Sequence, residues 1–231
     1  MGVKERHERD RETVARAILD AARDLFVTHG YQEVSIRKIA ERIEYSPAAI
    51  YSYFPSKDDI FFALAEEGFR LLFAYGATQR AALSNVEGPA PADAAETLRA
   101  MFLRYYEFSK EHPEYFALMF LDRSVPRISR DWERFGFVSE MKHDMVARIQ
   151  QAIDAGACPA DTPPHTVFRL LLTAVHGAAT LRLCDRLAPG EDADVLARAT
   201  IDTVLAGLQA GAGRHVNLPL CVHCDSEDKP S

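Results

Sequence analysis

The chain has 231 residues, of which 48% are hydrophobic and 26% charged. This composition is close to that of ordinary globular proteins and argues against the disordered and fibrous classes. The formal net charge is −7 at pH 7, yet residues 1–60 carry ten Lys and Arg against eleven Asp and Glu, a local net of −1. Because DNA binding needs a local cluster of cations rather than a basic chain, the charge does not exclude it.

Neither a membrane span nor an export signal is visible in the sequence. The longest uninterrupted apolar run, residues 115–121, has seven residues, whereas a helix that crosses a bilayer needs about 20. The N-terminus is charged and lacks the apolar stretch of a secretory signal. We therefore expect a soluble, cytoplasmic protein without a membrane partner.

An apolar stripe with helical spacing predicts a long first helix. Its members recur at i, i+3, i+4, i+7, i+8, i+11 and i+12, and they are Val14, Ala17, Ile18, Ala21, Ala22, Leu25 and Phe26. Gly30 follows the stripe, and we expect it to adopt the left-handed conformation that ends many helices.

Two short helices are predicted next, joined by a tight turn. Ser35 is placed to cap a helix over residues 36–43. Ser46, followed by Pro47 at the first helical position, predicts a second helix that Pro55 ends. Two short helices packed on a longer first helix form the helix-turn-helix pattern.

The rest of the chain is predicted to form longer helices separated by breaks that contain Pro or Gly. Their expected ranges are 56–77, 93–111, a short apolar helix that ends at 121, 130–154, 165–187 and 192–210. Ser56 is expected to cap the first of them by accepting a hydrogen bond from the Asp59 amide. Since strand signals are nearly absent, the predicted fold class is all-α.

The second short helix has a face that suits a DNA groove. Small residues at its start let the helix approach the groove floor, while the hydroxyl groups of Tyr51 and Tyr53 can reach phosphates. Residues 35–57 carry four cations against two acidic residues. The same spacing also occurs in helical proteins that do not bind DNA, in which Tyr51 would simply belong to the core.

Two stretches carry a specific resemblance, THGYQEVSIRKIAER at residues 28–42 and SPAAIYSYFPSKDDI at residues 46–60. They resemble the TetR family of bacterial transcriptional regulators. That family folds entirely into helices, binds palindromic DNA as a homodimer and releases it when a small molecule enters the C-terminal domain. The resemblance implies a one-component regulator, most often a repressor, with a double-stranded operator and a small-molecule effector as partners.

The resemblance assigns DNA contacts to both short helices. They are Ser35 and Arg37 on the first helix, Ser46, Pro47, Ala48, Tyr51 and Ser52 on the groove face of the second, and Tyr53 and Lys57 as phosphate contacts. Ile50 and Phe54 are expected in the core. Glu44 stands where many family members have glycine, and a left-handed conformation there would cost about 1 kcal/mol relative to glycine.

Large apolar side chains between residues 100 and 140 suit either an ordinary core or a pocket for an apolar or aromatic effector. The candidate effector-binding residues are Tyr105, Phe108, Phe116, Phe120, Trp132 and His176. His176 could equally be a core histidine whose hydrogen bonds are satisfied. The pair that it forms with Gly177 is similar to a His-Gly pair in one subfamily of TetR C-terminal domains.

A stripe with small residues along residues 192–210 predicts a helix–helix interface. Gly177 costs its helix about 1 kcal/mol relative to alanine, and we interpret it, with Ala178 and Thr180, as a close helix contact. The candidate dimer-interface residues are Gly177, Leu196, Thr200, Thr203, Val204 and Gly207. They could pack against a second copy as a four-helix interface, as the resemblance implies, or only within the chain.

Cys221 and Cys224 form a Cys-x-x-Cys pair near the end of the chain. With His215 and His223 nearby, the pair could bind a soft metal such as zinc or act as a redox pair. A regulator that responds to metal or thiol redox state is therefore the alternative function, and an incidental tail the simpler interpretation. No other metal or cofactor is expected.

No residues occur at the spacing of a known catalytic motif, so we expect no enzymatic activity. The expected organisation is a DNA-binding domain over residues 1–60, a ligand-binding and dimerisation domain over residues 61–212, and a mobile tail over residues 213–231.

Overall fold

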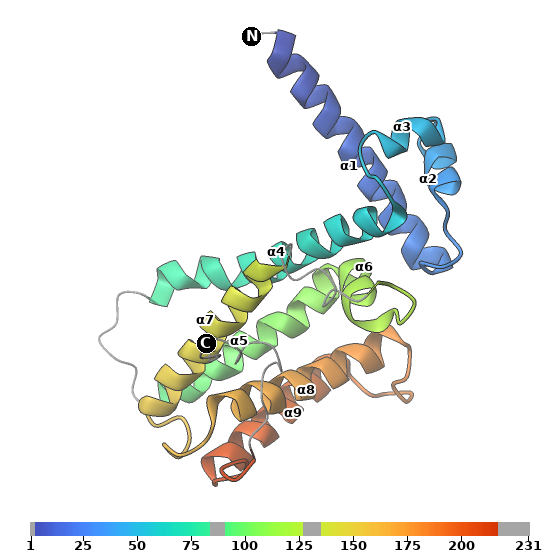
Figure 1. Cartoon of the computed structure of the whole chain (residues 1–231). Helices are drawn as coiled ribbons and strands as arrows, with labels where there is room; N and C mark the ends of the chain where they lie inside the picture. The colour runs from blue at the N-terminus through green and yellow to red at the C-terminus, as the bar shows by residue number, and fades with distance from the viewer. Residues whose placement is uncertain (1–2, 84–90, 127–134, 217–231) are drawn as a thin grey trace, which may run out of the picture. The chain divides into compact units, whose positions relative to one another are not determined.

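The computed structural model describes residues 3–83, 91–126 and 135–216, and every regular element in these ranges is a helix (Figure 1). This confirms the all-α prediction. The chain divides into two compact units. The first consists of the described residues up to Leu72 together with those between Glu111 and Gly136, and the second contains the described residues of the remainder.

The first unit begins with the long helix α1 (Val3–His29), followed by α2 (Ile36–Arg42) and α3 (Pro47–Tyr51). The start of α4 (Lys57–Leu83), which continues into the second unit, also belongs to it. Its core residues come from each of these helices and from the turn after α1, and they are Ile18, Ala22, Phe26, Val34, Ile39, Ile50, Ile60 and Phe61. The inner face of α1 thus follows the apolar stripe read from the sequence.

Serine side chains cap the starts of α2, α3 and α4 as predicted. Ser35 Oγ accepts a hydrogen bond from the Lys38 amide at 3.2 Å, and Ser46 Oγ accepts one from the Ala49 amide at 3.1 Å. Ser56 Oγ accepts from the Asp59 amide at 3.2 Å. Each bond satisfies an amide that has no partner within its helix, which fixes where that helix starts.

Two residues of this unit adopt the left-handed backbone conformation, and the sequence predicts it for Gly30 alone. Gly30 ends α1 with φ of 79°, and Glu44 turns the chain after α2 with φ of 59°. The helix α3 is shorter than expected because it ends at Tyr51, before Pro55. There Ser52 Oγ donates to the Ala49 carbonyl at 2.7 Å, a local bond of the kind that competes with continuation of a helix.

The first unit also contains α6 (Pro113–Phe116) and the π-helix η1 (Ala117–Leu121). The predicted short apolar helix therefore ends in a π-turn, in which the Asp122 amide donates to the Ala117 carbonyl five residues earlier. Arg23 Nη1 of α1 donates to the Tyr115 hydroxyl at 3.3 Å. The described residues from Glu111 to Pro126 thus belong to the same compact unit as the helix-turn-helix.

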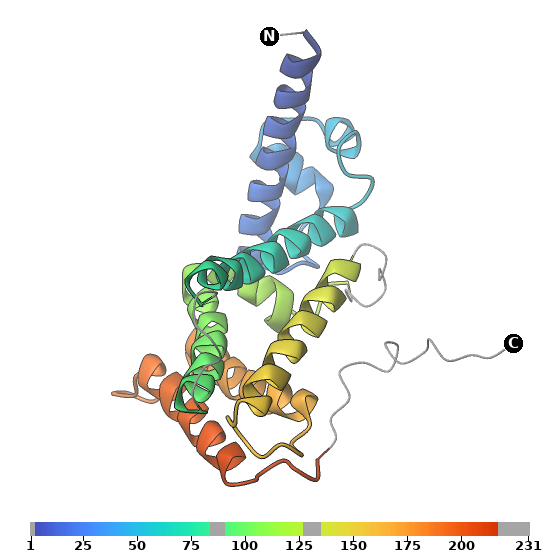
Figure 2. The same ribbon diagram turned by 90° about the vertical axis from the view of Figure 1, so that its left-hand side faces the viewer.

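The second unit is built from α5 (Pro91–Glu111), α7 (Gly136–Asp154), α8 (Pro164–Leu183) and α9 (Ala193–Gln209), with the end of α4. The helices α8 and α9 lie side by side (Figures 1 and 2). They bury apolar residues against each other and against the rest of the unit, among them Val167, Leu171, Val175, Ala197, Ile201 and Leu205. Of the predicted start of α7, residues 130–134 lie outside the described residues.

α8 ends at Leu183, four residues earlier than predicted, and its last turn shows why. Asp185 adopts φ of 52°, and its amide donates to the Arg182 carbonyl at 3.2 Å. The Arg186 amide donates to the Leu181 carbonyl at 2.9 Å. These two bonds form a Schellman motif, in which aspartate replaces the usual glycine. The sequence pattern missed it because no glycine marks the position.

Within the second unit, α5 and α8 are joined through Tyr105 and His176. The Tyr105 hydroxyl lies 2.9 Å from His176 Nδ1, and burial lowers the pKa of His176 below its ordinary value. His176 is half-buried and its Nδ1 has a hydrogen-bond partner, while its role as a core residue or as an effector contact stays a prediction.

We expect the lowered pKa of His176 to make the second unit less stable in acid. The unfolded chain binds a proton at this side chain with a pKa of about 6.5, and the folded chain resists it, so stability falls as the pH drops below that value. Thermal unfolding between about pH 7.5 and pH 5.5 should show a larger loss in Tm for the wild type than for His176→Gln. An equal loss in both proteins would contradict this assignment.

Candidate nucleic-acid interface

Most residues predicted to contact DNA are exposed on α2, α3 and the residues that flank them. Of the nine residues predicted to contact DNA, seven are exposed, namely Ser35, Arg37, Ser46, Pro47, Ala48, Tyr51 and Ser52. Tyr53 and Lys57 are half-buried. The Tyr51 ring is 54% exposed, an unusual position for a large aromatic side chain. We call these nine residues the α2–α3 face.

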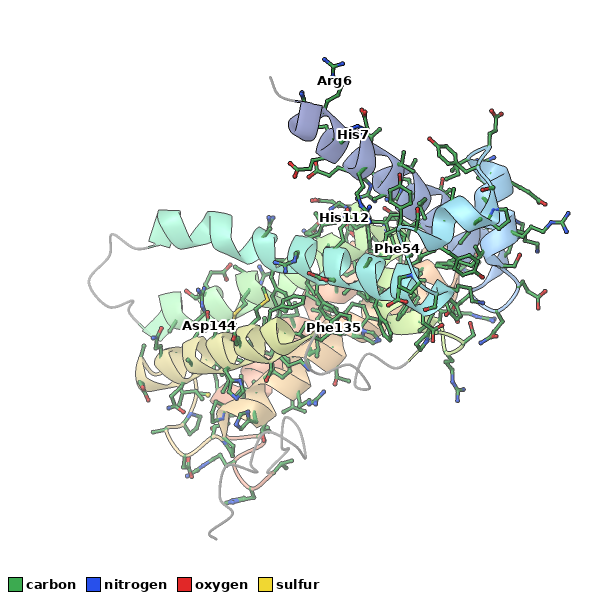
Figure 3. All side chains as sticks on the ribbon, turned by 45° about the horizontal axis from the view of Figure 1, so that its top comes forward. Arg6, His7, Phe54, His112, Phe135 and Asp144 are labelled. Atoms are coloured by element: carbon green, nitrogen blue, oxygen red, sulfur yellow. The ribbon has the colours of Figure 1, made fainter. Side chains whose placement is uncertain are left out.

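The opposite side of α2 and α3 is buried, which determines the direction in which the α2–α3 face points. Ile39 and Ala40 of α2 and Ile50 of α3 are fully buried. The prediction for Ile50 is thus confirmed. Phe54, labelled in Figure 3 near the junction of α3 and α4, is half-buried rather than fully buried, so it belongs to the edge of the core.

Arg37 provides an accessible cation on the α2–α3 face. Its side chain is 81% exposed, and its Nε donates to Glu41 Oε1 at 2.8 Å, one helical turn away. Exposed pairs of this kind contribute only about 0–1 kcal/mol. A phosphate group could therefore take the place of Glu41 at little cost.

Lys57 makes contacts within the protein in addition to the phosphate contact predicted for it. Its Nζ donates to the Tyr31 carbonyl at 2.9 Å and lies 4.1 Å from the centre of the Tyr31 ring. The cation thus holds the turn between α1 and α2 against the start of α4. An ammonium group has three donors, and the bond to Tyr31 uses one of them. Lys57 therefore still has donors for a phosphate, and that contact stays a prediction.

Tyr31, which the sequence analysis did not single out, connects several elements of the first unit. Its hydroxyl donates to the carboxylate of Asp58, and burial together with this carboxylate raises the pKa of Tyr31. Its amide donates to Asp122 Oδ2 at 3.3 Å. The ring is buried between Phe26 and Phe61, at centroid distances of 5.1 and 5.8 Å.

Asp122 completes this group, and we call Tyr31, Lys57, Asp58 and Asp122 the Tyr31 cluster. Asp122 Oδ1 also accepts from the Ser124 amide at 2.8 Å. The turn after α1 is therefore fixed from α4 on one side and from the end of η1 on the other. Contacts over 91 residues of sequence leave no periodic signal, which is why the sequence analysis missed them.

The candidate effector-binding residues fall into two groups, one in each unit. Phe116 and Phe120 belong to the first unit, with ring centroids 5.0 Å apart. Tyr105, Phe108 and His176 belong to the second, where Tyr105 meets His176 and Phe108 is fully buried. Trp132 lies outside the described residues. Their role in binding an effector stays a prediction.

The predicted dimer residues of α9 share a side of the helix that the described residues cover only in part. Thr203 is exposed, and Leu196, Thr200, Val204 and Gly207 are half-buried. The residues that α9 buries are Ala197, Ile201, Leu205 and Leu208, which lie on a different side of the helix. We call this partly covered side, with Leu196, Thr200, Thr203, Val204 and Gly207, the α9 outer face.

The expectation of a close contact at Gly177 requires a correction. Gly177 is exposed, and a Cβ atom placed there would meet nothing within 4 Å among the described residues. Ala178 beside it is buried. Packing within the described chain therefore does not account for this glycine, which leaves a contact with a second copy as the prediction.

Of the cysteines, Cys158 is buried and Cys184 is exposed, while Cys221 and Cys224 lie outside the described residues. In the described ranges, no group of three or more His, Cys, Asp or Glu side chains is arranged to hold a metal ion. The helices of the same ranges include none that is long and apolar enough to cross a membrane.

Comparison with known proteins agrees with this architecture. Residues 18–64 match a model described as bacterial regulatory proteins of the tetR family, and residues 98–204 match a model of the tetracyclin repressor-like C-terminal domain. The chain is 32% identical over 191 residues to the HTH-type transcriptional repressor Rv1474c of Mycobacterium tuberculosis. That alignment covers 82% of this chain and 89% of the relative.

Solved structures share the fold. The TetR family transcriptional regulator PfmR from Thermus thermophilus has a TM-score of 0.62 at 22% identity, covering 83% of this chain and 98% of that chain. A protein of unknown function from Rhodococcus sp. RHA1 has a TM-score of 0.64 at 25% identity, covering 84% and 95%. With the helix-turn-helix, the C-terminal match and a relative aligned over most of its length, the chain belongs to the TetR family of bacterial regulatory proteins.

Proposed function

We propose that the protein is a ligand-responsive transcriptional repressor that binds a near-palindromic operator as a homodimer. The observation that carries the proposal is the α2–α3 face, which exposes Tyr51 and Arg37 on two capped helices whose other side is buried. The name of the Mycobacterium tuberculosis relative, a transcriptional repressor, supports the sign of regulation. In this role the protein has no catalytic activity.

The α2–α3 face suits insertion into the major groove of DNA, which is about 12 Å wide and admits one helix. Small residues at the start of α3 allow its backbone to approach the bases. Tyr51 would reach base edges or the backbone, and Arg37 with Lys57 would contact phosphates on either side. Phosphate contacts fix the register, while contacts to base edges determine the sequence that is bound.

The α9 outer face supports dimerisation. Small side chains at Thr200, Thr203 and Gly207 permit close approach of a second α9, and Leu181 of α8, 39% exposed, adds apolar surface. A two-fold dimer would place the two copies of α3 about 34–36 Å apart, or a multiple of this distance, on half-sites of opposite orientation. The near-palindromic operator follows from that symmetry.

The proposed effector is a small apolar or aromatic molecule that binds in the second unit near Tyr105 and His176. Tyr105 is buried and His176 is half-buried, and each offers a polar group that a ligand could bind. Binding would release DNA only to the extent that the effector prefers the dimer geometry that does not fit the operator. The helix α4, which is shared by both units, would carry the change.

The proposal is tested by selection of random duplex DNA with the purified protein at about 0.15 M salt, where non-specific binding is weakened. An enriched near-palindrome would support a dimeric, sequence-specific regulator. If no sequence is enriched, the selection is repeated after refolding to remove any co-purified effector, and a second failure would contradict the proposed function.

Tyr51→Ala should weaken binding to the selected operator by at least about fivefold, since a side chain that contacts bases contributes about 1–3 kcal/mol. Tyr45→Ala is the matched control, because Tyr45 is 46% exposed in the adjacent turn but is not assigned to the α2–α3 face. Its affinity should stay within about twofold of the wild type. Equal losses in the two variants, measured by fluorescence anisotropy, would show that the α2–α3 face is assigned wrongly.

Thr203→Arg should weaken the homodimer by about 100-fold or more, because it places an unpaired charge in the α9 outer face. Gln209→Arg adds the same charge to an exposed position of α9 on another side and should leave the dimer unchanged. Sedimentation equilibrium measures both dissociation constants. If Thr203→Arg remains as dimeric as Gln209→Arg, the interface lies elsewhere.

An effector at Tyr105 and His176 should raise Tm and weaken operator binding, with stabilisation of about 2.7 kcal/mol at a hundredfold excess over its Kd. A panel of uncharged aromatic and aliphatic compounds, screened by thermal shift, provides the probes. His176→Gln should reduce the shift, whereas His143→Gln, which replaces an exposed histidine of α7, should not. A compound that releases DNA with equal potency from both variants would place its site elsewhere.

A further inference from the structure

The helix α3 is held by few contacts of its own. It has five residues, and Ile50 is the one that it buries. A helix of one turn and a half gains almost nothing from its internal hydrogen bonds, because nucleation consumes that gain. Its orientation therefore depends on groups that hold its ends. At the N-terminal end Ser46 provides the cap, and the C-terminal end needs a second attachment.

Arg11 of α1 supplies this attachment. Its Nη2 donates to the carbonyl oxygen of Ser52, the residue that caps α3, at 3.1 Å. The same guanidinium lies over the ring of Tyr53, with Cζ 5.3 Å from the ring centre. A planar guanidinium is able to stack on an aromatic ring while its N–H groups donate in the plane, which an ammonium cannot do.

Arg11 lies near the start of α1, outside the part of the helix that packs in the core. Arg11 lies seven residues before Ile18, the first fully buried residue of α1, and seven residues before the start of the match to the tetR family model. The beginning of α1 thus extends beyond the part that packs in the core. Arg11 and Tyr53 line a hollow of about 330 Å³ together with His7, Asp10 and Val14.

We propose that Arg11 is a positioning residue for DNA recognition. It holds the C-terminal end of α3 and the Tyr53 ring, so that Tyr51 and Ser52 meet the DNA in one orientation. Without Arg11, α3 remains anchored at Ile50 but its end is free to pivot. The inference rests on the proposed DNA-binding function, and it assigns specificity to a residue outside the helix-turn-helix.

A direct phosphate contact is the competing role for an exposed arginine beside a DNA-binding face. The two roles differ in salt dependence. A cation that neutralises one phosphate contributes about 0.9 to the slope of log K against log salt concentration, for operator and non-specific DNA alike. A positioning residue leaves that slope unchanged and affects mainly the sequence-specific part of the affinity.

The first experiment needs no DNA. Hydrogen exchange of the amides of residues 46–54, followed by mass spectrometry, compares the wild type with Arg11→Ala, Arg11→Lys and Arg6→Ala. Arg6 is the matched control, because it is exposed on the same helix and its side chain extends away from the other helices (Figure 3). Exchange should be about fivefold to tenfold faster in both Arg11 variants and unchanged in Arg6→Ala. Unchanged exchange in Arg11→Ala, or full rescue by lysine, would overturn the proposal.

The second experiment measures affinity for the selected operator and for random duplex at several salt concentrations. Arg11→Ala should bind the operator about fivefold to tenfold more weakly with an unchanged salt slope, and non-specific affinity should stay within about twofold. A slope lower by about 0.9 on both DNAs would assign Arg11 to a phosphate and overturn its positioning role. If the wild type itself selects no sequence, the proposed function fails, while the exchange experiment still decides whether Arg11 holds α3.

Discussion

The side chain of Ile50 attaches α3 to the hydrophobic core, and the orientation of the α2–α3 face depends on this attachment. One buried side chain defines a pivot rather than a direction, because a short rod held at one point still has rotational freedom. The flanking groups remove that freedom. Ser46 and the residues of the turn bond the start of α3, and Arg11 bonds its end. A helix of five residues is thereby presented to solvent although Ile50 is the only residue that it buries.

The Tyr31 cluster performs the same task for the turn between α1 and α2. Lys57 and Asp58 come from the start of α4, and Asp122 comes from the end of η1. The polar groups of Tyr31 are thus bonded by residues that lie far apart in the sequence, while its ring is buried between two phenylalanines. Any movement of α4 or η1 would change the surroundings of this turn directly.

Local chemistry made the helices of the first unit predictable from sequence. The serine caps and the left-handed glycine after α1 were expected, since each depends on residues within a few positions. The shortened end of α8 was missed because aspartate, not glycine, adopts the left-handed conformation of its cap. The Tyr31 cluster and Arg11 were missed because their partners lie 26 to 91 residues away, and such pairings follow only from the packed structure. Exposure separates the residues of the α2–α3 face from the core beneath them, but it does not tell which of them meets a base.

The π-turn of η1 has a consequence for how this part of the chain tolerates changes in length. A turn closed by a bond over five residues contains one residue more than an α-helical turn. Because each residue of an α-helix turns the chain by roughly 100°, every later position is rotated by about this angle relative to an uninterrupted α-helix. Asp122 follows this extra residue, and its carboxylate is thereby brought to the Tyr31 amide. Loss of a single residue between Ala117 and Leu121 would restore an ordinary α-helix and turn the carboxylate away from its partner. The segment is therefore sensitive to helical phase rather than to side-chain identity, and single-residue deletions there should be tolerated far less well than substitutions between similar apolar residues.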